Sequence, residues 1–514
     1  MRFTRGVVGY TRRVSLRWTV LFSGLLASAA VAQIPAPVTA EVDKFEHGKI
    51  IEKVPCAQRP EQSYALYLPS NYSASRSWPV VYSFDPGARG SFALQLQKDA
   101  AERYGFILAA SNNSRNGPWK PQFEAAQAMV QDTHEELSID DRRMYLAGFS
   151  GGARVAAQIA LSCHCAAGVL LSGAGFPFGT SPPHDSGFVV FSAVGTFDFN
   201  DPEVIPFEDK LGQAGYHIWL RIFERSHQWA PAEVMDEAFA WFRIEGMQSR
   251  LEPVDKSVVG LQFADAVKRA DSLAQAGDML DAWREYVQIV STYGSLVDVS
   301  AEQRKAETLG KEKAVRDAAK RERSDFEEQS QLTAEISAAL SKSRAAGQPD
   351  SDTGAELEDR VGLLRQREET EKRPERKRIY RRALSGVFIE AMESGSQFMD
   401  EKDYHRAARS FSCASQASPK SSWAWQNLAV AYAFAGARKD ALRALQSART
   451  VAENAPSFAA WLSSEPAFER IRSAPEFQAL LKTNGVTWTR RNDSLTAGRP
   501  RALTHTPPAD TLIG

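Results

Sequence analysis

Short apolar runs alternate with helix-like segments over residues 63–243, and this alternation constrains the fold more than any other feature. Several runs are continuously apolar, as in Val189-Val190-Phe191, rather than apolar at every second residue. Such runs are typical of strands in a sheet that is buried on both faces. The pattern predicts an α/β fold, with a mostly parallel sheet and helices on both faces. The expected strands are residues 64–68, 80–85, 106–111, 144–149, 168–172, 188–194 and 218–223, and the expected helices are 92–104, 121–137, 153–161, 202–214 and 231–242.

The strand pattern stops near residue 250, and the remainder has the character of an all-α helical-repeat region. Residues 301–386 are rich in charged residues and alanine, with sparse apolar positions. They predict a long solvated helix pair or a partly disordered arm, broken at Gly347-Gln348-Pro349. The expected organisation is an α/β domain with its lead-in at 33–250, a helical hairpin at 251–300, the charged arm at 301–386, helical repeats at 387–482 and a disordered tail at 483–514.

Similar residues recur 34 positions apart in the repeat region. Gly395 and Phe398 correspond to Ala429 and Tyr432, and Ala407 corresponds to Ala441. The spacing resembles two tetratricopeptide repeats over residues 387–452. A weaker hairpin of this kind is expected at 261–293, with Gly277-Asp278 at its turn. Such repeats imply a surface for a protein partner; the alternative is that they only cap the neighbouring domain.

The first 32 residues have the features of a secretory signal peptide. Five arginines and no acidic residue precede or border an apolar run at 18–32, which ends in Ala30-Val31-Ala32. The run is short for a stable membrane span. Arg12-Arg13 also resembles a twin-arginine signal. We therefore expect an exported protein, periplasmic or secreted, of bacterial type.

The charge balance gives no reason to expect nucleic-acid binding. The whole chain has a formal net charge of −1. Without the first 32 residues it carries 57 basic and 63 acidic side chains, and the net charge becomes −6. A basic surface is the usual signature of a nucleic-acid partner, and this composition lacks it.

The cysteines allow a disulfide but do not indicate a metal. Cys56, Cys163 and Cys165 fall within or just before the predicted α/β core, and export permits disulfide formation. A bridge from Cys56 to either of the other two is compatible with the sequence, and the connectivity stays open. Cys163-His164-Cys165 has no second ligand pair, so no zinc site is expected.

A G-x-S-x-G motif, Gly148-Phe149-Ser150-Gly151-Gly152, lies between a predicted strand and a predicted helix. This context favours a sharp turn that exposes Ser150 above the sheet as a nucleophile. Small residues are needed at positions 148 and 152 because backbone packs on backbone there. The helix N-terminus would favour a developing anion.

A serine nucleophile requires a base and an orienting carboxylate. His227 follows the strand at 218–223 and precedes a helix, where the base is expected; His184 is the second candidate. Asp198 lies just beyond the strand at 188–194 and is the expected acid. Asp209 and Asp201 are its rivals, although Asp209 is in a predicted helix and Asp201 is better explained as an N-cap before proline.

An oxyanion hole needs two preorganised amide N–H groups. Gly151, the residue after the nucleophile, is expected to supply one. The second is expected from the loop at 85–90, and the sequence leaves Gly87 and Ala88 as equal candidates.

A polar loop at 112–119 follows another predicted strand on the same side of the sheet. Asn113, Asn116 and Trp119 in this loop, together with Trp229, are candidate substrate-binding residues; a plain turn-rich loop is the alternative. The segment between residues 161 and 188 is too short for a folded lid. The site is expected to be open, or covered by the C-terminal helices.

Residues 60–245 resemble the α/β-hydrolase superfamily, and more narrowly the exported bacterial esterases of the polyhydroxybutyrate depolymerase and dienelactone hydrolase type. The matching segments are 63–69, 85–87, 148–152, 195–198 and 227–229. The resemblance implies an esterase-like Ser-Asp-His mechanism without a cofactor, acting on a small-molecule or polymeric ester. Depolymerase-type members have alanine after the serine, whereas this chain has Gly151.

The main hypothesis is therefore an exported serine hydrolase that cleaves carboxylic esters. One alternative is a periplasmic scaffold in which the repeats bind a partner and the hydrolase module is inactive. The other is a serine peptidase of the same fold.

Overall fold

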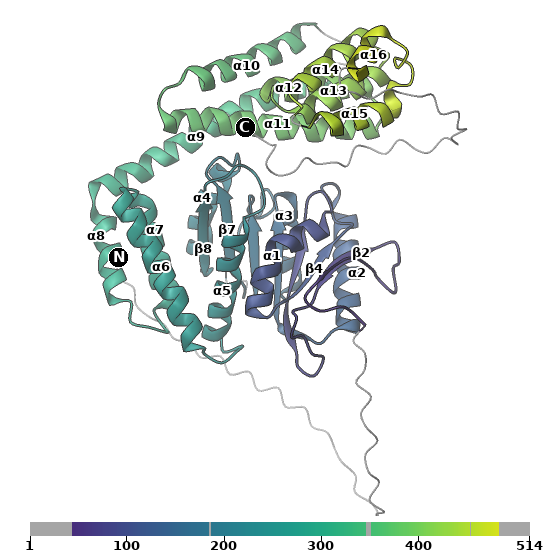
Figure 1. The fold of residues 1–514 in the computed structure, drawn as a ribbon. Coiled ribbons are helices and arrows are strands. Elements are labelled where there is room, and N and C mark those ends of the chain that lie inside the picture. Colours follow the sequence, from purple (N-terminus) through teal and green to yellow (C-terminus); the bar gives the residue numbers. More distant parts are fainter. Residues whose placement is uncertain (1–43, 185–186, 346–350, 453, 483–514) are drawn as a thin grey trace, which may run out of the picture. The chain divides into compact units, whose positions relative to one another are not determined.

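The computed structural model describes residues 44–184, 187–345, 351–452 and 454–482 (Figure 1). The signal peptide predicted at 1–32 and the tail predicted at 483–514 lie outside these residues. The elements below all lie in one unit that begins at Phe45. None of the helices in the described ranges combines the length and the apolar character that crossing a membrane requires.

Eight strands form one sheet in the order β1-β2-β4-β3-β5-β6-β7-β8. The pairings of β1 with β2 and of β2 with β4 are antiparallel, and the other pairings are parallel. The predicted α/β-hydrolase fold is confirmed by this mostly parallel sheet and the helices around it. The strands are β1 (Ile50–Pro55), β2 (Ser63–Tyr67), β3 (Trp78–Phe84), β4 (Ile107–Ser111), β5 (Ile139–Phe149), β6 (Gly168–Ser172), β7 (Val189–Gly195) and β8 (Ile218–Phe223).

Successive residues of the central strands enter two different hydrophobic cores, one on each face of the sheet. Val81 of β3 packs in one core with Phe239 and Phe242, whereas Val80 and Tyr82 pack in the other. This explains why the strands are continuously apolar, since both of their faces are buried. The helices of this part are α1 (Gly90–Tyr104), α2 (Trp119–Glu136), α3 (Gly151–Cys163), α4 (Asp201–Gln213) and α5 (Ala232–Gln248).

Two stretches of strand were not predicted. β1 is an edge strand with Glu52 and Lys53 exposed, so it lacks a continuous apolar run. The first part of β5, from Ile139 to Arg143, is only partly buried and carries charged residues. Apolar content identifies buried strands and fails where one face of the strand meets solvent.

Only helices follow α5 in the described residues, as the change in sequence character predicts. They are α6 (Lys256–Ala276), α7 (Met279–Tyr293), α8 (Ser300–Lys311), α9 (Lys313–Ala345), α10 (Ser351–Thr370), α11 (Pro374–Asp400), α12 (Tyr404–Ala417), α13 (Ser422–Phe434), α14 (Arg438–Thr450), α15 (Ala455–Ser464), the 3₁₀ turn η1 (Pro466–Phe468) and α16 (Pro475–Lys482).

The helical region is divided between two cores. The α6–α7 hairpin, which turns at Gly277 as predicted, shares the core of α5 through Ala270, Tyr286 and Ile289. A separate core is built from α9 to α16. The hairpin is therefore packed as part of the α/β domain.

The charged arm predicted at 301–386 is not simply solvated. Ile336 of α9, and Val361 and Leu364 of α10, are buried in the core that also contains α11 and α12. The few apolar positions suffice because their helical spacing puts them on one face. The predicted break at Gly347-Gln348-Pro349 lies outside the described residues, and the predicted boundary at residue 386 falls inside α11.

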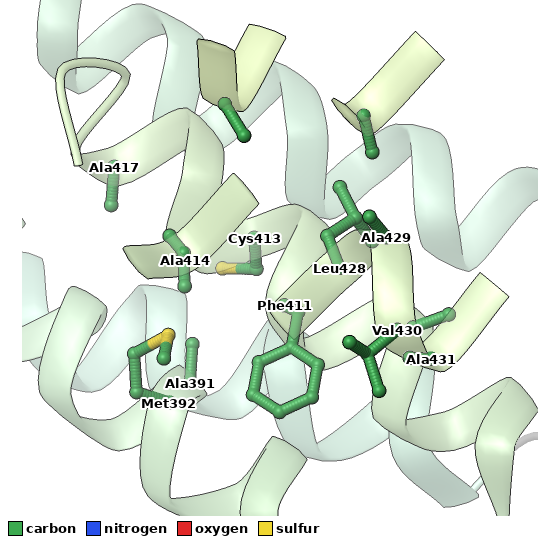
Figure 2. Close-up of a cluster of buried hydrophobic side chains, with 14 of the residues drawn as sticks. Ala391, Met392, Phe411, Cys413, Ala414, Ala417, Leu428, Ala429, Val430 and Ala431 are labelled. Carbon is green, nitrogen blue, oxygen red and sulfur yellow. The ribbon is translucent and has the colours of Figure 1, made fainter. Parts of the chain in front are cut away.

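Two helical hairpins, α11–α12 and α13–α14, occupy the segment predicted as repeats. Figure 2 shows Phe411 of α12 near Leu428 of α13, and Ala414 of α12 near Ala391 and Met392 of α11, in one shared core. Small residues allow the helices to approach closely, as the repeat pattern implies. The hairpins fit the predicted arrangement, and the tetratricopeptide assignment itself stays a prediction.

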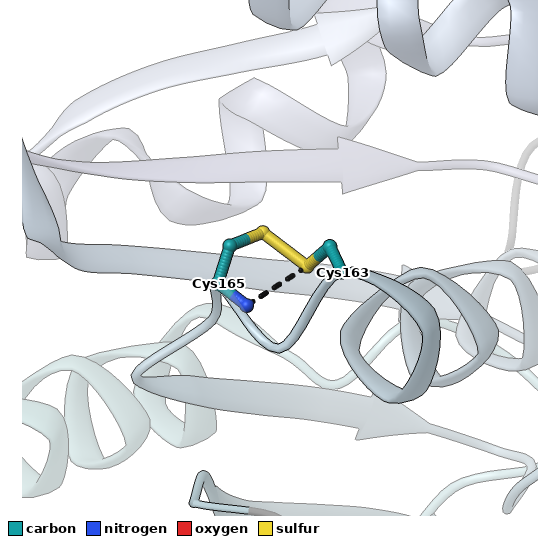
Figure 3. The surroundings of a disulfide bond; sticks show 2 residues. All are labelled: Cys163 and Cys165. Atoms are coloured by element: carbon teal, nitrogen blue, oxygen red, sulfur yellow. Dashed lines mark hydrogen bonds between the residues drawn. A yellow bond between two sulfur atoms is a disulfide. The ribbon is translucent and has the colours of Figure 1, made fainter.

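The disulfide joins a different pair of cysteines from the pairs considered in the sequence analysis. Cys163 and Cys165 are joined to each other at the end of α3, and the Cys165 amide lies 3.1 Å from the Cys163 sulfur (Figure 3). Cys56 is a buried thiol in the core that faces α2 and α3. A bridge from Cys56 to either partner is therefore not formed.

Gly395→Ala tests the packing of α11 on α12. A Cβ atom at position 395 would lie 2.4 Å from the ring of Phe411, which is fully buried. We expect the substitution to lower the free energy of unfolding by about 1–3 kcal/mol, measured by denaturant titration.

Gly362→Ala in α10 is the matched control. A Cβ atom there meets nothing within 4 Å, so the helix should be stabilised by about 0.5–1 kcal/mol. Equal stabilities of the two variants would contradict the close approach at Gly395.

Candidate active site

Ser150 lies at the turn between β5 and α3, with φ 52° and ψ −122°. A Cβ atom added at Gly148 would lie 2.1 Å from the carbonyl oxygen of Gly152, and one added at Gly152 would lie 2.0 Å from that of Phe84. The two glycines are required because the chain passes its own backbone at contact distance. This is the strained strand-to-helix turn expected for a G-x-S-x-G motif.

The structure brings Ser150, His227 and Asp198 into one hydrogen-bonded chain. His227 Nε2 lies 2.9 Å from Ser150 Oγ, and His227 Nδ1 lies 2.9 Å and 3.0 Å from the two carboxylate oxygens of Asp198. His227 follows β8 and Asp198 follows β7, as predicted. A nucleophile, a base and an orienting acid would need hydrogen bonds of this kind.

Asp198 and His227 are both enclosed by protein. Asp198 is completely buried, and its carboxylate also accepts a hydrogen bond from the Asn200 amide at 2.9 Å. The His227 ring packs against two phenylalanine rings, with centroid distances of 4.7 Å to Phe149 and 4.3 Å to Phe199. These contacts fix the plane of the imidazole.

The rival residues take other places. His184 is exposed, and Asp209 lies on the exposed side of α4. Asp201 is the first residue of α4 and not its N-cap, which is Asn200. Asp201 is instead buried and forms an ion pair with Arg382 of α11.

The predicted second oxyanion donors are corrected. The Gly87 amide donates to Asp85 Oδ1 at 2.8 Å, and the Ala88 amide donates to the Asp85 carbonyl oxygen at 3.0 Å. Both amides are thus already used within their own loop. Gly151, the first residue of α3, stays in the position expected of an oxyanion donor, because the first amides of a helix lack intrahelical acceptors.

Asp85 organises this loop and was not identified from the sequence. It is buried, and Arg89 binds it with two hydrogen bonds of 2.8 Å and 2.9 Å. The indole N–H of Trp229 donates to Asp85 Oδ2 at 2.7 Å. Trp229, predicted to bind substrate, therefore also holds the loop. An acid at the end of a buried strand with an arginine four residues later was the available signal.

A cavity of about 920 Å³ opens over Ser150 and His227. Of the two arrangements expected, an open site or one covered by C-terminal helices, the structure has the second. Its lining from α11 and α13 is Ile389, Met392, Glu393, Ser396, Gln397, Asp400 and Trp423, and its lining from the α/β domain includes Phe92, Leu96, Asn116, Phe149 and Trp229.

Among the candidate substrate-binding residues of the polar loop, Asn116 alone lines this cavity. Asn113 accepts a hydrogen bond from the Ser63 amide at 2.9 Å and anchors the loop to β2. Trp119 is 42% exposed and stacks on Phe123. Neither Asn113 nor Trp119 lines the cavity over Ser150.

Asn116 links the cavity wall of the α/β domain to the wall formed by α11. Its side-chain nitrogen donates to Glu393 Oε1 of α11 at 2.7 Å, and its side-chain oxygen lies closest to the position of a Cβ atom on Gly151. Burial raises the pKa of the Glu393 carboxyl, while the Asn116 hydrogen bond and the His227 imidazole oppose that rise. Glu393 had no sequence signal, because its partner is 277 residues away.

No protein-family model and no curated protein matches this chain. Solved structures similar to it include FphF, a fluorophosphonate-binding serine hydrolase of Staphylococcus aureus, with 10% identity, a TM-score of 0.31, and coverage of 38% of this chain and 98% of that one. The S954A mutant of the feruloyl esterase module from Clostridium thermocellum has 15% identity, a TM-score of 0.32, and coverage of 37% and 86%. An esterase of Pyrobaculum calidifontis has 13% identity, a TM-score of 0.31, and coverage of 38% and 85%.

Gly152→Ala and Gly151→Ala form a matched pair that tests the turn. At position 152 the methyl group would meet the backbone of Phe84, which cannot move without disrupting β3. We expect this variant to lose about 3 kcal/mol of stability or to fail to fold. At position 151 the nearest atom is Asn116 Oδ1, at the end of a side chain that can rotate.

We expect Gly151→Ala to change the stability by about 1 kcal/mol or less, measured by thermal unfolding. Comparable losses in both variants would contradict this description of the turn.

Proposed function

We propose that this protein is an exported serine hydrolase that cleaves carboxylic esters. The observation that carries the proposal is the continuous hydrogen-bonded chain from Ser150 through His227 to Asp198, at a strained turn facing a cavity. The arginine-rich start of the sequence and its apolar run support the export part of the proposal.

The geometry supports acyl transfer in two steps. Ser150 Oγ attacks the ester carbonyl carbon while His227 Nε2 takes its proton. The Gly151 amide at the start of α3 donates to the oxyanion. His227 then returns the proton to the departing alcohol, and an acyl-enzyme results. In the second step His227 takes a proton from water, whose oxygen attacks the acyl carbon. The bond to Ser150 Oγ then breaks, His227 returns the proton to that oxygen, and the acid leaves. Asp198 holds the imidazole tautomer throughout.

The cavity favours an ester with an apolar group. Phe92 and Leu96 from α1 and Ile389 and Trp423 from the helical region supply apolar walls. Burial of such a group against these side chains would contribute about 25 cal/mol per Å² of apolar surface. The resemblance to exported esterases agrees with this substrate class.

Ser150→Ala tests the nucleophile. Wild-type protein is expected to hydrolyse a short p-nitrophenyl ester and to form an adduct with a fluorophosphonate probe. The variant should lose at least about a thousandfold in kcat and the adduct entirely, because the attacking oxygen is absent. Ser249→Ala, on the exposed end of α5, is the control and should behave as wild type.

The alternatives give different results in the same experiment. An inactive scaffold would form no adduct at Ser150. A peptidase would form the adduct but turn over peptides in preference to esters. Either result would overturn the ester assignment.

Ile389→Trp tests the cavity wall. The larger ring would fill part of the cavity that Ser150 also lines. We expect kcat/KM for a long-chain ester to fall by about tenfold or more, with little change for the acetate ester, since one large apolar contact is worth roughly 1–3 kcal/mol. Equal changes for both esters would place the acyl group elsewhere.

A further inference from the structure

The loop that carries Asp198 is held on one side by the α/β domain itself. The Thr196 amide donates to the Phe223 carbonyl oxygen at 2.8 Å, and the Phe197 amide donates to the Arg225 carbonyl oxygen at 2.9 Å. These bonds tie the loop after β7 to the strand and loop that lead to His227. These bonds use amide groups of the loop, and the carbonyl groups of Thr196 and Phe199 accept from partners elsewhere.

The helical region supplies those partners. Arg382 of α11 donates from Nε to the Thr196 carbonyl oxygen at 2.8 Å, and Gln329 of α9 donates to the Phe199 carbonyl oxygen at 3.0 Å. The two accepting residues, Thr196 and Phe199, stand on either side of Asp198 in the sequence. The backbone around the acid is therefore fixed by residues 130 and 186 positions later in the chain.

The side chain of Phe199 contacts both α11 and His227. Its side chain packs against Gly386 of α11, where an added Cβ atom would lie 3.4 Å from Phe199 Cβ. Its ring lies 4.3 Å from the His227 ring, centroid to centroid. The surface of α11 thus touches the acid's loop and, through one ring, the imidazole.

Arg382 makes a second contact with the α/β domain, in addition to its bond to Thr196. Its guanidinium pairs with Asp201, which is 1% exposed. Burial raises the pKa of Asp201 and the Arg382 charge opposes that rise. Burying such a pair requires good geometry and further hydrogen bonds, and the bond to Thr196 is one of them.

We propose that Arg382 is a positioning residue for the hydrolysis: from α11 it fixes the loop that presents Asp198 to His227. The inference rests on the proposed function and deepens it, because it makes the helical region a structural part of the catalytic site. Arg382 acts through the loop and does not touch the reacting atoms.

Arg382→Met in the full chain is the first test. Loss of the bond to Thr196 should let the loop shift, and a misplacement of about 1 Å can cost about a hundredfold in rate. We expect kcat for a p-nitrophenyl ester to fall by about ten- to a hundredfold, with KM within about threefold of wild type. Arg382→Lys should recover part of kcat, since one ammonium group can satisfy Thr196 or Asp201 but not both.

A double variant, Arg382→Met with Asp201→Asn, separates positioning from charge. It buries no unpaired carboxylate, so it should fold even where the single variant does not. It still lacks the donor to Thr196, and its kcat should be as low as that of Arg382→Met. Arg376→Met is the matched control, because it removes an ion pair between α11 and Glu328 of α9 without a contact to the catalytic loop. Its kcat should equal that of wild type.

A folded double variant with kcat within about threefold of wild type would overturn the inference. A loss in Arg376→Met equal to that in Arg382→Met would do the same, because the effect would then be general to the helix interface. Failure of the proposed function is distinguishable: wild-type protein would show no Ser150-dependent turnover or adduct. If turnover depends on Ser150 but is unchanged by substitution of Arg382, only the positioning role is refuted.

Discussion

Parallel pairing of β5, β6, β7 and β8 is the constraint on which the site depends. Their registers align the strand ends, with Phe149 opposite Ser172 and Gly195 opposite Phe223. The loops that follow these strands therefore leave the sheet at one edge. Ser150, Asp198 and His227 are far apart in sequence and meet there because each follows a strand of this set. Helices bury both faces of the sheet that carries these loops.

The fold class and the places of these three residues follow from local patterns in the sequence. Continuous apolar runs mark the strands, and each candidate stands just after one. The pattern fails at β1, where one strand face meets solvent, and at the charged arm, where sparse but well-spaced apolar residues suffice for burial. It could not identify Arg382 or Glu393, because their partners are brought to them only by tertiary packing.

The change in composition near residue 250 does not coincide with a physical boundary. The α6–α7 hairpin belongs to the core of the α/β domain, whereas α9 to α16 enclose a core of their own. Helix α11 takes part in both structures: it contributes Phe388 and Met392 to the helical core and lines the cavity over Ser150. A truncation at the compositional boundary would remove one wall of that cavity together with the support of the Asp198 loop.

The two buried thiols lie in different cores. Cys56 belongs to the core between the sheet and α3, and Cys413 belongs to the core of α9 to α16. Burial also raises the pKa of the Cys56 thiol to about 11, which disfavours the reactive thiolate in the folded state. Each thiol becomes accessible only when its own core opens. A thiol-specific reagent would therefore label Cys56 when the sheet core unfolds and Cys413 when the helical core unfolds. The order of labelling would show which core unfolds first.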